Sequence, residues 1–254
     1  MTGNHFDPIR LGARIQSYLR AHALQRADYE RAGPFIAGFS LQDANPYLNY
    51  AVPEDFAHPS PADIDRLIAA FRRRKRKPRL EYIAQAAPEV EPALLAAGFE
   101  TENRFPLLAC SPALVAAITS RDVTIETAAT ETDIRDAVDI GAEAYGAPHS
   151  PEPLRRLIGQ GGVLMLARTG NTAVAAGMAT PAHGGVTEVA GIGVRPAWQR
   201  RGIAAALTSA ITREAFARGA ELAWLTPGHE AAEIAYRRAG FVRATEQLHI
   251  SRPG

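Results

Sequence analysis

The chain has 254 residues, a hydrophobic fraction of 46%, a charged fraction of 22% and a formal net charge of +1. This composition is typical of a globular protein of one large or two small domains, and so small a net charge argues against a general attraction to nucleic acid or anionic membranes. No signal peptide or membrane span is expected, and the single cysteine, Cys110, has no partner for an internal disulfide, so we expect a cytoplasmic protein.

The first half of the sequence predicts strands and helices separated by turn residues. Strands are expected at FIAGFS (35–40), YAVP (50–53) and RLEYIA (79–84). A helix is expected to begin near Pro61 and to end in the basic run RRRKRKPR, Arg72–Arg79. Positive charge at the C-terminal end of a helix complements the helix dipole, and nucleic-acid binding by the run is the alternative interpretation.

The second half predicts the order strand, helix, three strands, helix, strand, helix, strand. The strands are VTIET, GGVLMLARTG, AVAAGMATPAHGG, VTEVAGIGV, ELAWLT and TEQLHIS, at residues 123–127, 161–170, 173–185, 186–194, 221–226 and 245–251. Helices are expected at 131–146, from 203 to a terminal glycine at Gly219, and at 230–241, while APHSPEP (147–153) is expected to be a loop. Strands and helices in this order predict an α/β (α+β) fold in which helices pack on a mixed sheet.

The two halves of the sequence resemble each other when Gly98 is aligned with Gly240. LLAAGFETENRFPLLACS then matches YRRAGFVRATEQLHIS, and RLEYIA falls on ELAWLT without a gap. Agreement of strand, helix and terminal glycine at nearly one offset predicts an internal duplication. We therefore expect two domains of the same kind, residues 1–119 and 120–254, each a mixed twisted sheet flanked by helices.

The segment WQRRGIAAAL, Trp198–Leu207, places polar side chains and a glycine directly before a predicted helix. The first N–H groups of a helix lack intrahelical partners, and Gly202 would let an anion approach them without a Cβ in the way. The corresponding segment of the first half, EDFAHPSPADI, has prolines instead, so we expect phosphate binding in the second half alone. Pro196 is incompatible with a G-x-G-x-x-G dinucleotide motif, and the sequence has no nucleotide P-loop.

On these residues the second half resembles the GNAT N-acetyltransferases. QRRGIA (199–204) fits the acetyl-CoA motif Q/R-x-x-G-x-G/A of that family, EVAGIGVRP precedes it at the right distance, and AYRRAGF is similar to the family's tyrosine helix. The first half looks like a degenerate second copy, so the whole chain resembles tandem-domain members of the superfamily.

The resemblance implies acetyl-CoA as co-substrate. The coenzyme's pyrophosphate would lie on the loop amides, its pantetheine arm would pair with the strand before the proline, and the thioester would enter between that strand and the next. The residues implied in coenzyme binding are Ile192, Gly193, Val194, Gln199, Arg200, Arg201, Gly202, Ile203, Ala204, Ala205 and Tyr236. His229 belongs to the same set, because it stands where many relatives carry a pantetheine-binding asparagine.

The resemblance also implies direct attack of an amine on the thioester in a ternary complex. A backbone N–H at Val194 is the candidate to stabilise the oxyanion, and Tyr236 is the family-matched acid that protonates the leaving thiolate. Glu188 lies on an otherwise apolar strand, on one face with Ala190 and Ile192. We expect Glu188 either to accept the amine proton or to orient a cationic acceptor.

Tyr145 and His149 are expected to line the acceptor pocket, since in the family the first helix and the loop after it border that pocket. Aminolysis of a thioester requires no metal, and the sequence contains no metal-binding motif.

The residues leave two other functions open. One is an acyl-CoA-binding or regulatory module without turnover, and the other is a nucleic-acid-associated protein that acts through the basic run. For the enzyme we expect acetyl-CoA and a small-molecule or peptide amine as ligands, no nucleic acid, no membrane, and a monomeric pseudo-dimer or a homodimer.

Overall fold

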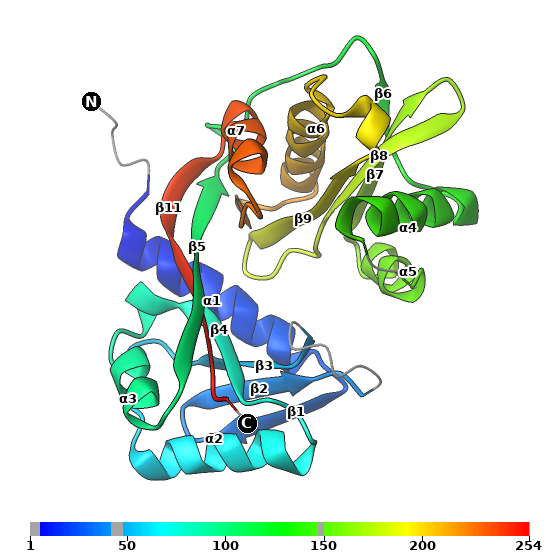
Figure 1. The fold of residues 1–254 in the computed structure, drawn as a ribbon. Helices are drawn as coiled ribbons and strands as arrows, with labels where there is room; N and C mark the ends of the chain where they lie inside the picture. Colours follow the sequence, from blue (N-terminus) through cyan, green and yellow to red (C-terminus); the bar gives the residue numbers. More distant parts are fainter. Residues whose placement is uncertain (1–5, 42–47, 147–149, 254) are drawn as a thin grey trace. The chain divides into compact units, whose positions relative to one another are not determined.

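The structure is a computed structural model that describes residues 6–41, 48–146 and 150–253 (Figure 1). Its contacts divide the chain into two compact units, Met1–Leu107 with Ala244–Gly254, and Leu108–Arg243. The boundary expected after residue 119 lies inside the second unit. His149, an expected acceptor residue, lies outside the described residues.

The first unit is built on strands in the order β1-β2-β3-β4-β11. These strands are Asp28–Ala32, Phe35–Phe39, Tyr50–Pro53, Arg79–Ile83 and Val242–Ser251, and the helices are α1 (Pro8–Leu24), α2 (Pro61–Arg73) and α3 (Val90–Ala96). Strands β3 and β4 are parallel, and the other neighbours are antiparallel. Gly38 of β2 approaches Ala23 of α1, while the next residue, Phe39, packs edge-on against Phe71 of α2. Because successive residues of a strand face opposite sides, α1 and α2 cover opposite faces of this sheet.

Helix α2 begins at Pro61 and ends in the basic run, as the sequence predicts, and a capping box stabilises its start. The Ser60 hydroxyl accepts the N–H of Asp63, and the Asp63 carboxylate accepts the N–H of Ser60 at 2.8 Å. At the other end, Arg74 forms ion pairs of 2.7 Å with both Asp28 and Glu30.

Two further cations of the run are also paired. Lys77 and Arg79 bind the Glu102 carboxylate at 2.9 Å and 2.8 Å. These ion pairs within the protein support the interpretation of the run as the end of a helix. They also leave fewer cations free to bind the phosphate backbone of a nucleic acid.

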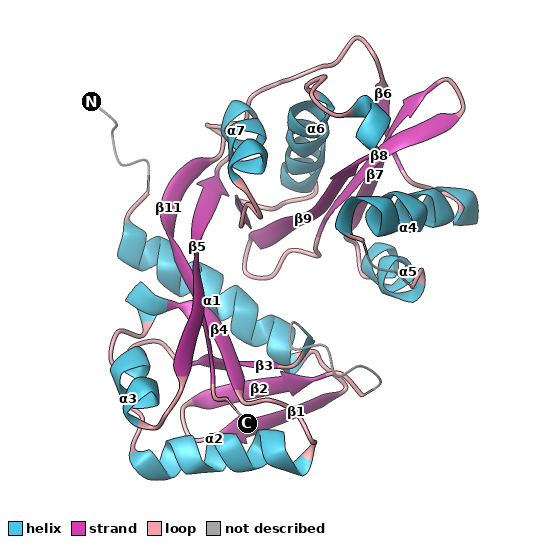
Figure 2. Ribbon diagram, in the orientation of Figure 1, coloured by secondary structure: helices cyan, strands magenta, loops and turns pink. Residues whose placement is uncertain are grey.

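The second unit is built on strands in the order β5-β10-β9-β8-β7-β6 (Figure 2). In chain order, β5 to β10 are Glu100–Cys110, Thr124–Thr127, Val163–Thr169, Thr172–Ala179, Val186–Val194 and Leu222–Leu225. The helices are α4 (Glu131–Tyr145), α5 (Glu152–Gly159), α6 (Ile203–Ala217) and α7 (Glu230–Arg238). Strand β10 runs parallel to β9, and the remaining pairs in this unit are antiparallel. The mixed α/β architecture is therefore confirmed.

Helices α4 and α6 lie on opposite faces of this second sheet. A Cβ on Gly193 of β9 would contact Ala144 and Ile140 of α4, whereas a Cβ on Gly177 of β8 would contact Ile211 of α6. Helix α5 was not predicted, and its first two residues, Glu152 and Pro153, fall in the segment that was expected to be a loop. The proline in its first turn, Pro153, is tolerated because the first N–H groups of a helix need no intrahelical acceptor.

The strands β5 and β11 each run through both units. Residues Leu108–Cys110 of β5 pair with β10 of the second unit, and Gln247–Ser251 of β11 pair with β4 of the first. In each unit, one outermost strand of the series therefore comes from the other half of the sequence: β11 in the first unit and β5 in the second. Within the described ranges, every helix is too short or too polar to cross a membrane.

Candidate functional site

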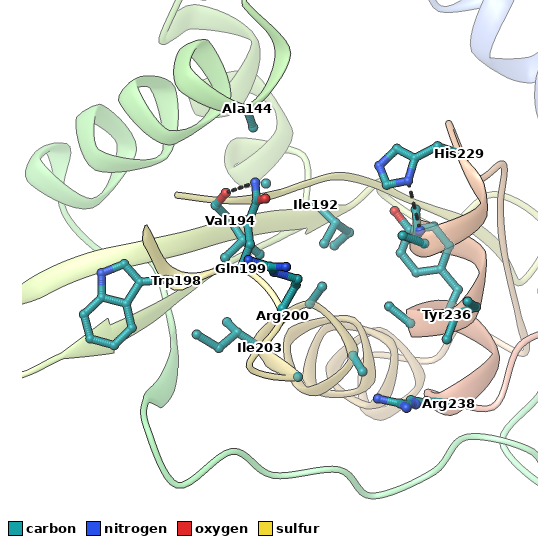
Figure 3. Close-up of a pocket in the computed structure, with 18 of the residues that line it drawn as sticks. Ala144, Ile192, Val194, Trp198, Gln199, Arg200, Ile203, His229, Tyr236 and Arg238 are labelled. Carbon is teal, nitrogen blue, oxygen red and sulfur yellow. Dashed lines mark hydrogen bonds between the residues drawn. The ribbon is translucent and has the colours of Figure 1, made fainter. Parts of the chain in front are cut away.

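A cavity of about 340 Å³ lies in the second unit, where the end of α4, the end of β9, the start of α6 and one side of α7 meet (Figure 3). Most residues predicted for the site line it: Tyr145, Ile192, Gly193, Val194, Gln199, Arg200, Gly202, Ile203, Ala204, Ala205, His229 and Tyr236. Among the described residues, Glu188 and Arg201 are the predicted ones that do not line this cavity. The roles of all these residues stay predictions.

Helix α6 opens onto the cavity with an uncapped N-terminus. Its N-cap is Gly202, with a φ of 77°, and no side chain caps the helix. The first intrahelical bond joins the Ala206 N–H to the Gly202 carbonyl at 3.1 Å, so the N–H groups of Ile203, Ala204 and Ala205 have no intrahelical acceptor. A Cβ added to Gly202 would meet nothing within 4 Å, so the space beside Gly202 is open. This geometry favours an anion, because the amides point at it and the helix dipole adds to the attraction.

The two arginines before Gly202 point in different directions. Arg200 has a φ of 61° and lines the cavity. Arg201 lies over the ring of Trp198, 4.7 Å from its centre, and its Nη2 donates to the Ala197 carbonyl at 3.3 Å. Of this pair, Arg200 is therefore the one placed to contact an anion in the cavity.

Strand β9 contains a bulge at Gly191. The pairing with β8 shifts its register between Ala176 and Met178, and Gly191 has a φ of 64° that favours glycine. The extra residue reverses the alternation of side chains along the strand. The expectation that Ile192 shares a face with Glu188 was therefore wrong.

The side chain of Ile192 packs on the α6 face of the sheet. It approaches Gly177 of β8 together with Ile211 of α6. A bulge also leaves backbone groups outside the regular ladder, and this one lies where β9 reaches the cavity.

The edge of β9 that faces β10 is open beyond Glu188. Within the described residues, the β9–β10 pairing ends where Glu188 lies opposite Trp224. On the β8 side, the Arg195 N–H donates to the Val174 carbonyl at 2.9 Å. Antiparallel neighbours alternate between bonded and non-bonded pairs, so the N–H and C=O of the preceding residue, Val194, point away from β8. Since Val194 lines the cavity, these groups face it.

Two side chains occupy carbonyl groups along this open edge. The Tyr145 hydroxyl donates to the Ile192 carbonyl at 3.1 Å. Nε2 of Gln199 donates to the Val194 carbonyl at 3.2 Å, as Figure 3 shows. Tyr145, expected at the acceptor pocket, thus lies in the same cavity as the predicted coenzyme residues. A ligand that pairs with these carbonyls has to replace both side chains.

Tyr236 and His229 lie on the α7 side of the cavity (Figure 3). Tyr236 is 9% exposed, and its burial, together with the nearby Tyr145 phenol, raises the pKa of its hydroxyl. The hydroxyl therefore stays protonated at neutral pH and is able to donate a proton. His229 is the N-cap of α7, where Nδ1 accepts the Ala232 N–H at 3.2 Å. With Nδ1 engaged, the neutral ring offers a cavity ligand a donor at Nε2.

Glu188 is half-buried at the last position of β9 that pairs with β10. The lining residues that sequence reasoning missed are Ala144, Trp198, Ala231, Ala232, Ile234, Ala235 and Arg238. Among these Arg238 carries a charge. The i,i+4 spacing of Glu233 and Arg237 is the sequence signal that could have distinguished the two arginines. Nowhere in the described ranges do three or more His, Cys, Asp or Glu side chains gather as a metal site would require.

Comparison with known proteins gives consistent matches to one family. A family model described as "Acetyltransferase (GNAT) family" matches residues 134–241. A solved GCN5-related N-acetyltransferase from Kribbella flavida is 30% identical, with a TM-score of 0.83 over 96% of this chain and 96% of that one.

More distant structures share the fold. A GCN5-related N-acetyltransferase from Sphaerobacter thermophilus is 18% identical, with a TM-score of 0.62 over 87% of this chain and 78% of its own. A tandem GNAT protein from the clavulanic acid biosynthesis pathway is 9% identical, with a TM-score of 0.59 over 88% of this chain and 82% of its own. At these identities the likeness is one of fold alone. Among curated protein sequences, none matches this chain.

Proposed function

The chain belongs to the GCN5-related N-acetyltransferase (GNAT) family, and on that premise we propose that it transfers the acetyl group of acetyl-CoA to a primary amine of a small-molecule or peptide acceptor. One observation carries the proposal: an uncapped helix N-terminus and an open strand edge face the same cavity. The first feature fits a phosphate group and the second fits a chain of amides, and the coenzyme contains both.

Groups that line the cavity would hold the coenzyme. The pyrophosphate would accept hydrogen bonds from the amides at the start of α6, with Arg200 adding a charge-assisted contact. The pantetheine arm would pair with the open edge of β9 from Ile192 to Val194 and would displace Tyr145 and Gln199 from its carbonyls.

The chemistry is a direct aminolysis. The amine nitrogen forms a bond to the thioester carbonyl carbon, and the carbon–sulfur bond breaks. The Val194 N–H, which faces the cavity, would stabilise the negative charge on the carbonyl oxygen. Tyr236 would give its proton to the leaving thiolate, and its raised pKa keeps that proton in place until then. Glu188 would either accept the amine proton or orient a cationic acceptor.

The first unit would not bind a second coenzyme. Its counterpart of α6 in the predicted duplication is α2, whose N-terminus is already occupied by the Asp63 carboxylate and begins with Pro61. An incoming phosphate would meet that negative charge instead of free amides.

Calorimetry with acetyl-CoA tests the binding half of the proposal, and a screen of primary amines with a free-thiol readout tests turnover. We expect binding and thiol release that depends on the amine. No heat of binding at millimolar acetyl-CoA would end the proposal, while binding without turnover on any amine would favour the module without catalysis.

Substituting Tyr236 tests the assignment of the acid. Tyr236→Phe is expected to lower kcat by roughly 10²- to 10⁴-fold, the usual worth of general acid catalysis, with little change in the Kd of acetyl-CoA. Unchanged kcat in a variant that melts at the wild-type temperature would remove the acid role.

A further inference from the structure

Arg238, the last residue of α7, lines the cavity without a partner of its own. Among the described residues, no carboxylate or carbonyl binds its guanidinium. The preceding residue, Arg237, does not line the cavity and has Nη1 3.9 Å from the Glu233 carboxylate. The two adjacent arginines of α7 therefore differ in their surroundings: Arg237 lies near the Glu233 carboxylate, and Arg238 lines the cavity.

The cavity concentrates positive charge. Its described lining includes Arg200, Arg238 and the uncapped start of α6, and it contains no Asp or Glu. Like charges around one concave site repel one another, and this repulsion is relieved when an anion binds. The positive charge of Arg200 and Arg238 therefore indicates that the bound ligand carries anionic groups.

The position of Arg238 separates it from the pyrophosphate site. Figure 3 shows Arg200 on the β9 side of the first turn of α6 and Arg238 on the α7 side. Arg238 also lies about two and a half turns of α7 beyond His229. One phosphate pair would engage the α6 amides and Arg200, which leaves the exposed Arg238 available for a second anionic group.

We propose that Arg238 binds the phosphate monoester on the ribose of the coenzyme, so that this protein distinguishes 3′-phosphorylated coenzyme from its dephospho form. The inference rests on the proposed function. A phosphate monoester carries nearly two negative charges at neutral pH, and a guanidinium binds it through short, charge-assisted hydrogen bonds.

The test is calorimetry with two ligands, coenzyme A and 3′-dephospho-coenzyme A. The wild type is expected to prefer coenzyme A by roughly 10- to 100-fold, the worth of a hydrogen bond between charged groups. Arg238→Gln should lose most of this preference by weakening coenzyme A alone, and Arg238→Lys should restore part of it.

Arg237→Gln is the matched control. It removes the same charge from the adjacent position, and Glu233 keeps its two bonds to Arg243, of 2.6 Å and 2.7 Å. The preference for coenzyme A should be unchanged in this variant.

The outcomes separate this inference from the proposed function. Equal binding of both ligands by the wild type would overturn the inference while the proposed function stands. An equal loss of both ligands in Arg238→Gln would also overturn it, because the side chain would then act on the whole site. Binding of neither ligand by the wild type would overturn the proposed function and the inference with it.

Discussion

Placing a carboxylate at Gly202 should weaken coenzyme binding through charge rather than through misfolding. Gly202 has a φ of 77°, and a Cβ there meets nothing within 4 Å, so a side chain would enter open space at the start of α6. Non-glycine residues pay about 1–2 kcal/mol for this backbone region, and Asp and Asn tolerate it better than most. The protein should therefore fold with Gly202→Asp.

The effect on binding follows from the distance at which the charges meet. A carboxylate about 4 Å from one phosphate charge is opposed by about 1 kcal/mol in bulk water and about 4 kcal/mol near a protein surface. Because each 1.4 kcal/mol is about tenfold in affinity, we expect the Kd of acetyl-CoA to rise by roughly 5- to 1000-fold.

Gly202→Asn is the matched control, with nearly the same shape and the same tolerance of positive φ but no charge. Calorimetry at low and at high salt, with thermal unfolding of each variant, should show that Asp weakens binding far more than Asn and that salt narrows the difference. Equal weakening by Asp and Asn would refute the electrostatic argument. Unchanged binding by Gly202→Asp would show that the phosphates lie elsewhere.

Three further changes probe other features of the structure. Tyr145→Phe removes the hydroxyl that binds the Ile192 carbonyl and leaves this carbonyl free for the coenzyme. Calorimetry should therefore show that the variant binds acetyl-CoA roughly two- to tenfold more tightly, the effect of one hydrogen bond. Weaker binding would mean that the hydroxyl itself contacts the ligand. Burial, with Arg79 nearby, lowers the pKa of His249 from 6.5 to about 4, so between these pH values the unfolded chain binds a proton that the folded chain does not. Stability should be complete above pH 6.5 and fall as the pH drops to 4, and His249→Gln should flatten this fall in melting temperature; an equally steep fall would contradict the assignment. Because the Asp63 carboxylate caps α2, calorimetry should give one acetyl-CoA per chain, and a stoichiometry of two would count against the occupied N-terminus.

Local signals in the sequence are enough to predict where several of the helices begin or end. Gly98, Gly219 and Gly240 follow α3, α6 and α7 with φ values of 81°, 97° and 104°, as expected of glycines that terminate helices. Gly202 lies at the start of α6, where the motif predicts it. In each case the residue type and its neighbours along the chain determine the local conformation.

Features that depend on a neighbouring strand or on a side chain's direction were not predictable in this way. The bulge at Gly191 exists only in relation to the register of β8, so a reading of alternation along β9 alone places Ile192 on the wrong face. Arg200 and Arg201 are equivalent in the motif, and the positive φ of Arg200 helps to direct them apart.

The route of β5 and β11 makes the two halves of the gene product depend on each other. A chain cut between residues 119 and 120 would leave β10 without its β5 neighbour, and the four buried residues of β10 would form an open, apolar strand edge prone to aggregation. The same cut would free a C-terminal half whose last strand has lost β4, its partner in the first unit. Deleting the final ten residues of the protein would therefore damage the sheet built by its first hundred.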